Sequence, residues 1–239
     1  MTLAILFAAA LGSSMISGLL GMAGGVTLLA VMTFIYPLPL IVPLHGAVQF
    51  ASNSSRTFML RKSVRVSGFV YFLAAAPLGA AAAYFILKQF SQMEEGIYLV
   101  VALLFYTSLK PRKMPDIKLS DKGYFLLGLA ATTLGPLIGA TGPLLAPFFA
   151  RDDYSKEEIV ATKAACQIVI HLLKFPIFYH LAFPYKDYAL IILVMVFAVI
   201  LGTRAGVFLL GRISAERFKI LLKIALFLTG VRLCLKILA

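Results

Sequence analysis

Polar side chains recur at helical spacing in two otherwise apolar stretches of the sequence. One stretch carries His45, Gln49, Asn53 and Arg56, and the other carries Lys163, Gln167, His171 and Lys174. Within each set the residues stand at i, i+4, i+8 and i+11, so they share one helix face. Both faces are rich in hydrogen-bond donors and hold no Asp or Glu, so the ligand that they predict is an anion.

Two Gly-rich segments offer a second kind of anion-binding group. They run over residues 18–25 and 135–143, and Gly or Pro at such density interrupts a helix. The N-terminus of a half-helix exposes free N–H groups and the positive end of its dipole. We expect these groups near Gly24 and Gly142 to bind the anion, with hydroxyl donors from Thr27 and Thr141. Alternatively, Gly24 and Gly25 only allow two helices to pack closely.

The predicted site combines both features. The substrate-binding residues are expected to be Gly21, Gly24, Gly25, Thr27, Gln49, Asn53, Arg56, Gly139, Thr141, Gly142, Gln167, His171 and Lys174. His171 and His45 are candidates for proton coupling, because imidazole titrates near neutral pH. We expect no catalytic residue, metal site or cofactor.

Each polar residue also has a structural interpretation. Gln49 and Gln167 can simply join helices by hydrogen bonds. Arg56 and Lys174 can extend to a membrane interface, with only the stem of the side chain in apolar surroundings. A single histidine is most often a satisfied buried side chain.

The composition indicates where these faces must lie. Of the 239 residues, 61% are hydrophobic and 13% are charged, against about 45–50% and about 25% in soluble domains. Such a chain is neither a soluble domain, a disordered chain nor a disulfide scaffold. A membrane span needs about 20 apolar residues, so the length allows roughly six to eight spans.

The net charge of +12 is interpreted mainly as a mark of cytoplasmic loops. We expect no nucleic-acid partner, since so apolar a chain has no free basic face for a duplex. Cys166 and Cys234 lie in apolar runs without CxxC spacing and are expected to pack. The apolar N-terminus has no basic region before it, so we expect it to belong to the mature fold.

Eight apolar segments emerge from this pattern. They are Leu3–Ile35, Leu40–Leu60, Val66–Leu87, Gly96–Leu109, Gly123–Ala150, Ile159–Tyr179, Tyr188–Leu210 and Phe218–Leu238. The longest connection is basic and contains two prolines, which divides the chain into a first repeat (1–110), a basic cytoplasmic linker (111–122) and a second repeat (123–239).

The two halves resemble each other. Adding 118 to the residue numbers brings Gly21 onto Gly139, Gln49 onto Gln167 and both Gly-rich segments into register. The basic loop follows the second segment in the first half but the third segment in the second half, which indicates inverted repeats. Inversion requires an odd number of crossings per half, so the Gly-broken first segment is expected to be a re-entrant hairpin. A parallel repeat with eight crossings is the alternative.

At this point the chain resembles the TauE/SafE family of membrane permeases. The resemblance is carried by Gly18-Leu-Leu-Gly21-Met-Ala-Gly24-Gly25, by Asn53-Ser-Ser-Arg56, and by Gly139-Ala-Thr-Gly142-Pro143 with Gln167 and Lys174. It covers nearly the whole chain and implies export of sulfite or an organosulfonate such as sulfoacetate. The second copy departs from the first, because Pro143 stands where the first has Gly25 and His171 where it has Asn53.

The sequence therefore predicts an all-α, multi-pass inner-membrane secondary transporter of a small sulfur-containing anion. Its expected partners are that anion and the lipid bilayer. The sequence is also compatible with a homodimer. An anion channel or a permease for another small anion is the alternative. A membrane-embedded enzyme lacks support, because no HExxH, paired intramembrane carboxylates or Ser/His/Asp set occurs. A purely structural membrane subunit is a further possibility.

Overall fold

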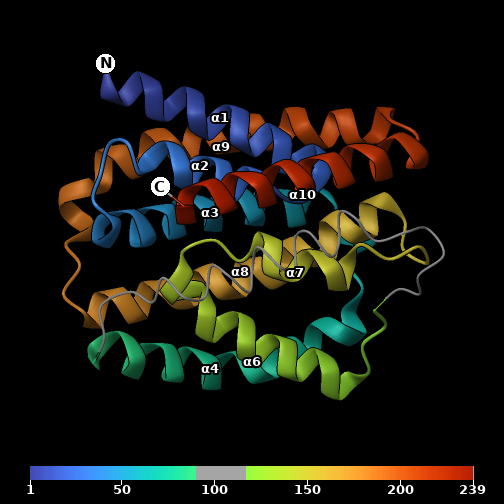
Figure 1. Cartoon of the computed structure of the whole chain (residues 1–239), viewed down its shortest axis with the longest axis horizontal. Helices are drawn as coiled ribbons and strands as arrows, with labels where there is room; N and C mark the ends of the chain where they lie inside the picture. The colour runs from blue at the N-terminus through green and yellow to red at the C-terminus, as the bar shows by residue number, and fades with distance from the viewer. Residues whose placement is uncertain (90–116, 239) are drawn as a thin grey trace.

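A computed structural model describes residues 1–89 and 117–238, and this part of the chain is built from helices (Figure 1). The elements are α1 (Thr2–Leu20), α2 (Gly24–Met32), α3 (Leu38–Met59), η1 (Arg61–Ser63), α4 (Val66–Gln89), α6 (Asp121–Ile138), α7 (Gly142–Phe149), α8 (Lys156–His180), η2 (Tyr185–Tyr188), α9 (Ala189–Arg212) and α10 (Ala215–Leu238). The predicted segment Gly96–Leu109 and residues 111–116 of the predicted linker lie outside the described residues.

The two predicted helix interruptions are confirmed. α1 stops before Gly21 and α6 stops before Gly139, and these glycines have φ values of +73° and +82°. Such left-handed conformations favour glycine because a Cβ would clash there with the backbone. The chain then restarts as α2 at Gly24 and as α7 at Gly142.

The two helices with polar faces, α3 and α8, pack against each other in the middle of the bundle. The colours of Figure 1 show that they run in opposite directions. α8 begins three residues before the predicted segment, at Lys156, because Ser155 and Glu158 form a capping box there. The polar faces lie inside the protein, since His45, Gln49 and Gln167 are buried.

The remaining helices pair across the two halves of the chain. α1 packs chiefly on α9, and α6 packs chiefly on α4. The first helix of each half (α1 or α6) is thus held by a helix of the other half (α9 or α4). Apolar contacts hold these pairs, with Leu6 and Met195 in one core cluster and Phe72 and Leu127 in another.

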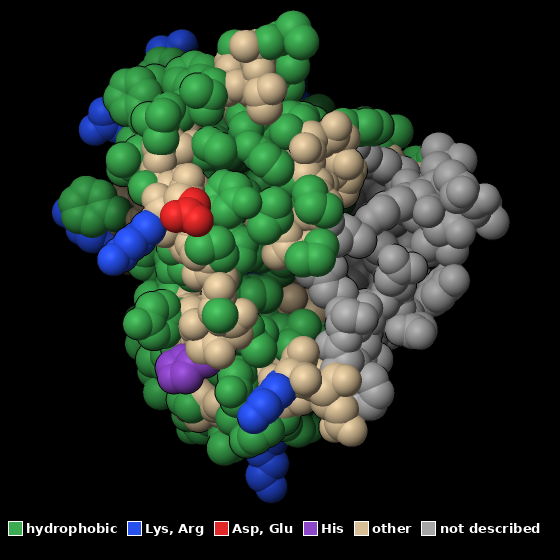
Figure 2. Space-filling model, turned by 90° about the vertical axis from the view of Figure 1, so that its left-hand side faces the viewer, with side chains coloured by type: hydrophobic (Ala, Val, Ile, Leu, Met, Phe, Trp, Pro, Cys, Tyr) green, Lys and Arg blue, Asp and Glu red, His purple; other side chains and the backbone are tan. Residues whose placement is uncertain are grey.

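The outer surface is apolar, as a lipid-facing surface must be. In the described part of the chain, four helical segments are long and apolar enough to cross a membrane: Thr2–Leu20, Val66–Gln89, Lys156–His180 and Tyr185–Arg212. α4 and α9 expose large apolar side chains such as Phe85, Leu193 and Phe197. Figure 2 shows hydrophobic side chains over most of the described surface on one end, with only scattered charges. The chain is therefore a membrane protein.

Residues 60–65, 150–158 and 210–219 lie at the other end of the bundle, on the right of Figure 1. They carry eight Lys and Arg against five Asp and Glu, and we call this the basic end. Arg65 bonds Glu158 at 2.7 Å and lies over the ring of Tyr154. Lys156 Nζ donates to the carbonyl oxygen of Leu210 at 2.6 Å. These contacts join the α3–α4 connection, the start of α8 and the end of α9.

Candidate functional site

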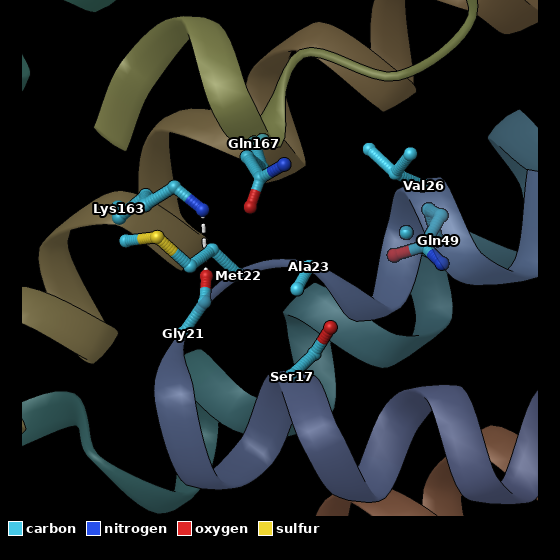
Figure 3. A pocket seen from close by; sticks show the side chains of 10 residues that line it. Ser17, Gly21, Met22, Ala23, Val26, Gln49, Lys163 and Gln167 are labelled. Carbon is cyan, nitrogen blue, oxygen red and sulfur yellow. Dashed lines mark hydrogen bonds between the residues drawn. The ribbon is translucent and has the colours of Figure 1, made fainter. Parts of the chain in front are cut away.

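A cavity lies where the interruption between α1 and α2 meets the N-terminus of α7 (Figure 3). In Figure 3 the side chains of Ser17 and Gln167 point toward the interruption from opposite sides, and Lys163 reaches the carbonyl oxygen of Gly21. In this conformation the cavity has room for about one water-sized body. The lining residues are Ser17, Gly21, Met22, Ala23, Gly25, Val26, Gln49, Gly142, Lys163 and Gln167.

Lys163 supplies the charge of this cavity. Its side chain is 0% exposed, and its Nζ donates a hydrogen bond of 2.6 Å to the carbonyl oxygen of Gly21. This is one of the carbonyls that a helix C-terminus leaves unpaired, and a cation is favourable there. The ammonium group has three N–H donors, so two remain to meet a ligand. The spacing in the sequence placed Lys163 on the polar face, but Lys163 was not among the predicted ligands.

Two glycines leave the backbone open to the cavity. A Cβ on Gly25 would stand 3.6 Å from the amide of Gln49. A Cβ on Gly142 would stand 3.5 Å from Nε2 of Gln167 and 3.6 Å from Nζ of Lys163. The glycines therefore bring the starts of α2 and α7 close to these polar groups.

Gly24 has a different role from its neighbour. A Cβ there would come within 1.8 Å of the carbonyl oxygen of Ser13 and 2.2 Å of Oγ of Ser17. The alternative of a close helix contact therefore holds for Gly24, where α2 turns back onto α1. Gly25 instead faces Gln49.

A second group of buried polar residues contacts the backbone of both interruptions. Lys174 Nζ donates to the carbonyl oxygen of Gly139 at 2.6 Å, and Nε2 of His45 lies 2.8 Å from the carbonyl oxygen of Gly25. The rings of His45 and His171 meet edge to face, with centroids 6.0 Å apart. Nδ1 of each ring and Oγ1 of Thr141 are buried without a hydrogen-bond partner.

Arg56 is held by its own helix. Its guanidinium donates to Oδ1 of Asn53 and Oγ of Ser52, both at 3.2 Å, and Asn53 Nδ2 donates to the carbonyl oxygen of Gln49 at 2.8 Å. Arg56 and Lys174 are each 1% exposed. The alternative in which they extend to a membrane interface is therefore wrong.

The structure brings only some of the predicted residues to the cavity. Those that line it are Gly21, Gly25, Gln49, Gly142 and Gln167. The other predicted residues do not line it: Gly24, Thr27, Asn53, Arg56, Gly139, Thr141, His171 and Lys174. The Thr27 hydroxyl donates to its own helix at Ala23. Four lining residues were not predicted from the sequence, because only the turn at Gly21 brings them together: Ser17, Met22, Ala23 and Val26. Lys163 was detectable as the counterpart of His45 in the second half.

The electrostatics of the interior are one-sided. Arg56, Lys163 and Lys174 are fully buried, whereas no Asp or Glu of residues 1–89 and 117–238 is. Taking charges out of water is costly unless they are paired, and backbone or amide oxygens offset only part of that cost. A small anion near these groups would supply the missing opposite charge.

Comparison with known proteins gives one match. The family model described as "Sulfite exporter TauE/SafE" matches residues 5–233, which is nearly the whole chain. No curated protein and no solved structure matches significantly.

Proposed function

The chain belongs to the TauE/SafE family of sulfite exporters, and from this premise we propose that it exports a small sulfur-containing anion as a secondary transporter. The substrate class is sulfite or an organosulfonate of the sulfoacetate type. The single observation that carries the proposal is a set of three buried cations beside two interrupted helices, with no buried carboxylate in the described residues 1–89 and 117–238.

The anion binds in the cavity at the Gly21 interruption. Lys163 supplies the charge, Gln49 and Gln167 supply amide donors, and Gly142 leaves the N-terminus of α7 open to the ligand. A sulfonate presents three oxygens, which suits donors that converge from different helices. Because the cavity now holds about one water-sized body, substrate binding requires the surrounding helices to separate.

Alternating access of two inverted repeats fits this geometry. The proposal is supported by the opposite directions of α3 and α8 and by the exchange of partners between α1–α9 and α6–α4 (Figure 1). The two interrupted helices are then re-entrant hairpins whose tips meet inside the bilayer. The basic end faces the cytoplasm and the protein is a multi-pass protein of the inner membrane.

Proton coupling belongs to the same proposal and concerns the histidine pair. The charged or titratable groups near His171 are His45 on α3 and Lys163 and Lys174 on α8 itself. We expect His171→Gln to keep part of the binding but to flatten the pH dependence of transport in proteoliposomes. An unchanged pH profile would remove His171 from the coupling step.

The test is a thermal-shift screen of the purified protein against sulfite, sulfate, thiosulfate, sulfoacetate and taurine, with sodium and pH varied. Sulfite or a sulfonate should raise the melting temperature, because a ligand that binds only the folded state stabilises it. Saturable counterflow in proteoliposomes then separates a transporter from the channel alternative, since a channel does not show it. No shift with any anion would favour a structural subunit and contradict the proposal.

A further inference from the structure

The polar residues around Gly139 are not explained by the cavity. His45, Thr141, His171 and Lys174 are all buried, yet none of them lines it. Three of their polar atoms have no hydrogen-bond partner: Nδ1 of His45, Nδ1 of His171 and Oγ1 of Thr141. Buried polar groups normally find partners, because an unpaired one retains its desolvation cost. Three such atoms among buried residues of α3, α7 and α8, one of them two residues after Gly139, therefore point to a ligand.

Thr141 is the most informative of these residues. It stands at the N-cap of α7, where a threonine hydroxyl usually accepts a bond from the backbone, but it makes no such bond. Its hydroxyl therefore does not cap the helix. The residue 118 positions earlier is Ala23, whose side chain has no hydrogen-bond donor.

The two interruptions correspond to each other in the predicted repeat. At Gly21 the ammonium of Lys163 borders a cavity. At Gly139 the ammonium of Lys174 bonds the carbonyl in the same way, at the same 2.6 Å, but Lys174 does not line that cavity. In alternating access, rocking of one repeat against the other would give the anion access to the Gly139 side in turn.

We propose that Thr141, His171 and Lys174 form a second anion station at the Gly139 interruption, which the substrate occupies after it leaves the Gly21 cavity. This inference rests on the proposed function and concerns the same class of anion. Lys174 keeps two N–H donors beyond its bond to Gly139, the Thr141 hydroxyl is a free donor, and His171 donates from Nδ1 in one tautomer. His45 on α3 faces the same station across the ring contact.

The test separates binding from transport. Thr141→Val removes the hydroxyl at nearly constant volume, and the matched control Thr141→Ser keeps it. Calorimetry with sulfoacetate in detergent measures binding to the cavity, and counterflow of the same anion in proteoliposomes measures passage. Lys163→Met, which alters the cavity, is the comparison variant.

We expect Thr141→Val to keep the Kd for sulfoacetate within about threefold of the wild type but to slow counterflow by about tenfold or more, the effect of losing one hydrogen bond to an anion. Thr141→Ser should retain most of the counterflow. Lys163→Met should instead raise the Kd. The melting temperature of Thr141→Val should not fall, because the hydroxyl has no partner to lose.

Two results would overturn the second station. Unchanged counterflow in Thr141→Val would mean that the unpaired hydroxyl has no role in passage. An equal rise of Kd in Thr141→Val and Lys163→Met would mean one shared site. Failure of the proposed function looks different, because the wild type itself would then neither bind nor exchange sulfoacetate or sulfite.

Discussion

Gly24 and Gly142, 118 residues apart, are equivalent in the predicted repeat, but alanine should have opposite consequences at the two positions. Gly24→Ala should damage the fold, and Gly142→Ala should damage binding. The reason is what a new Cβ would meet at each position. At Gly24 it would meet a fixed backbone carbonyl of α1, and at Gly142 it would meet the ends of two flexible side chains.

The structure gives the size of each effect. At Gly24 the Cβ would lie 1.8 Å from the carbonyl oxygen of Ser13, whereas carbon–oxygen contacts need about 3.3 Å or more. α2 must therefore move away from α1 by more than 1 Å (about 3.3 Å minus 1.8 Å). Overpacking of this kind costs about 3 kcal/mol or more, which lowers the melting temperature by roughly 6–12 °C.

At Gly142 the new methyl group makes only ordinary contacts, 3.5 Å from Nε2 of Gln167 and 3.6 Å from Nζ of Lys163. Stability should change little. The methyl group would, however, stand where an anion oxygen must lie to be about 2.7–2.9 Å from those donors. Losing one charge-assisted hydrogen bond costs about 1.5–3 kcal/mol, which is roughly a 10- to 150-fold rise in Kd.

The assay is thermal unfolding of both variants in detergent, followed by calorimetric titration with sulfoacetate or sulfite. The reasoning is refuted if folded Gly142→Ala binds the anion within about threefold of the wild type. It is also refuted if Gly24→Ala melts at the wild-type temperature, since the contact with Ser13 would then not limit the approach of α2.

Three further predictions follow from other contacts. Lys163→Met should weaken anion binding by about tenfold or more without unfolding the protein, whereas Lys156→Met, which also removes a lysine–carbonyl bond on α8, should leave calorimetric affinity unchanged. Asn53→Ala should lower the melting temperature, because the buried guanidinium of Arg56 loses one of its two acceptors, at about 1–3 kcal/mol. The hydrogen bonds from Arg151 keep the pKa of Asp153 below its ordinary value. The small stability advantage of the wild type over Asp153→Asn, at most about 1 kcal/mol, should therefore be present at pH 7 and vanish as thermal unfolding is measured below about pH 4.

Much of the fold followed from local chemistry. The interruptions at Gly21 and Gly139 were predictable because a run of glycine and proline weakens a helix wherever it stands. The inward direction of the faces of α3 and α8 was predictable from spacing, since polar side chains in an apolar helix must avoid lipid. The start of α8 was not predictable from the apolar pattern, because the capping box at Ser155 extends the helix into a polar segment.

The sequence by itself determined that this is an all-helical membrane protein with a donor-rich interior, because composition and periodicity are properties of the chain alone. The tertiary structure decided which of the buried polar residues line the same cavity. Gly24 and Gly142 are equivalent in sequence, yet one contacts α1 and the other opens onto a cavity. Lys163 and Lys174 bond equivalent carbonyls, yet only Lys163 borders that cavity. The physical reason is that the interior is filled by side chains from both halves at once, so the room beside each group depends on residues more than 100 positions away.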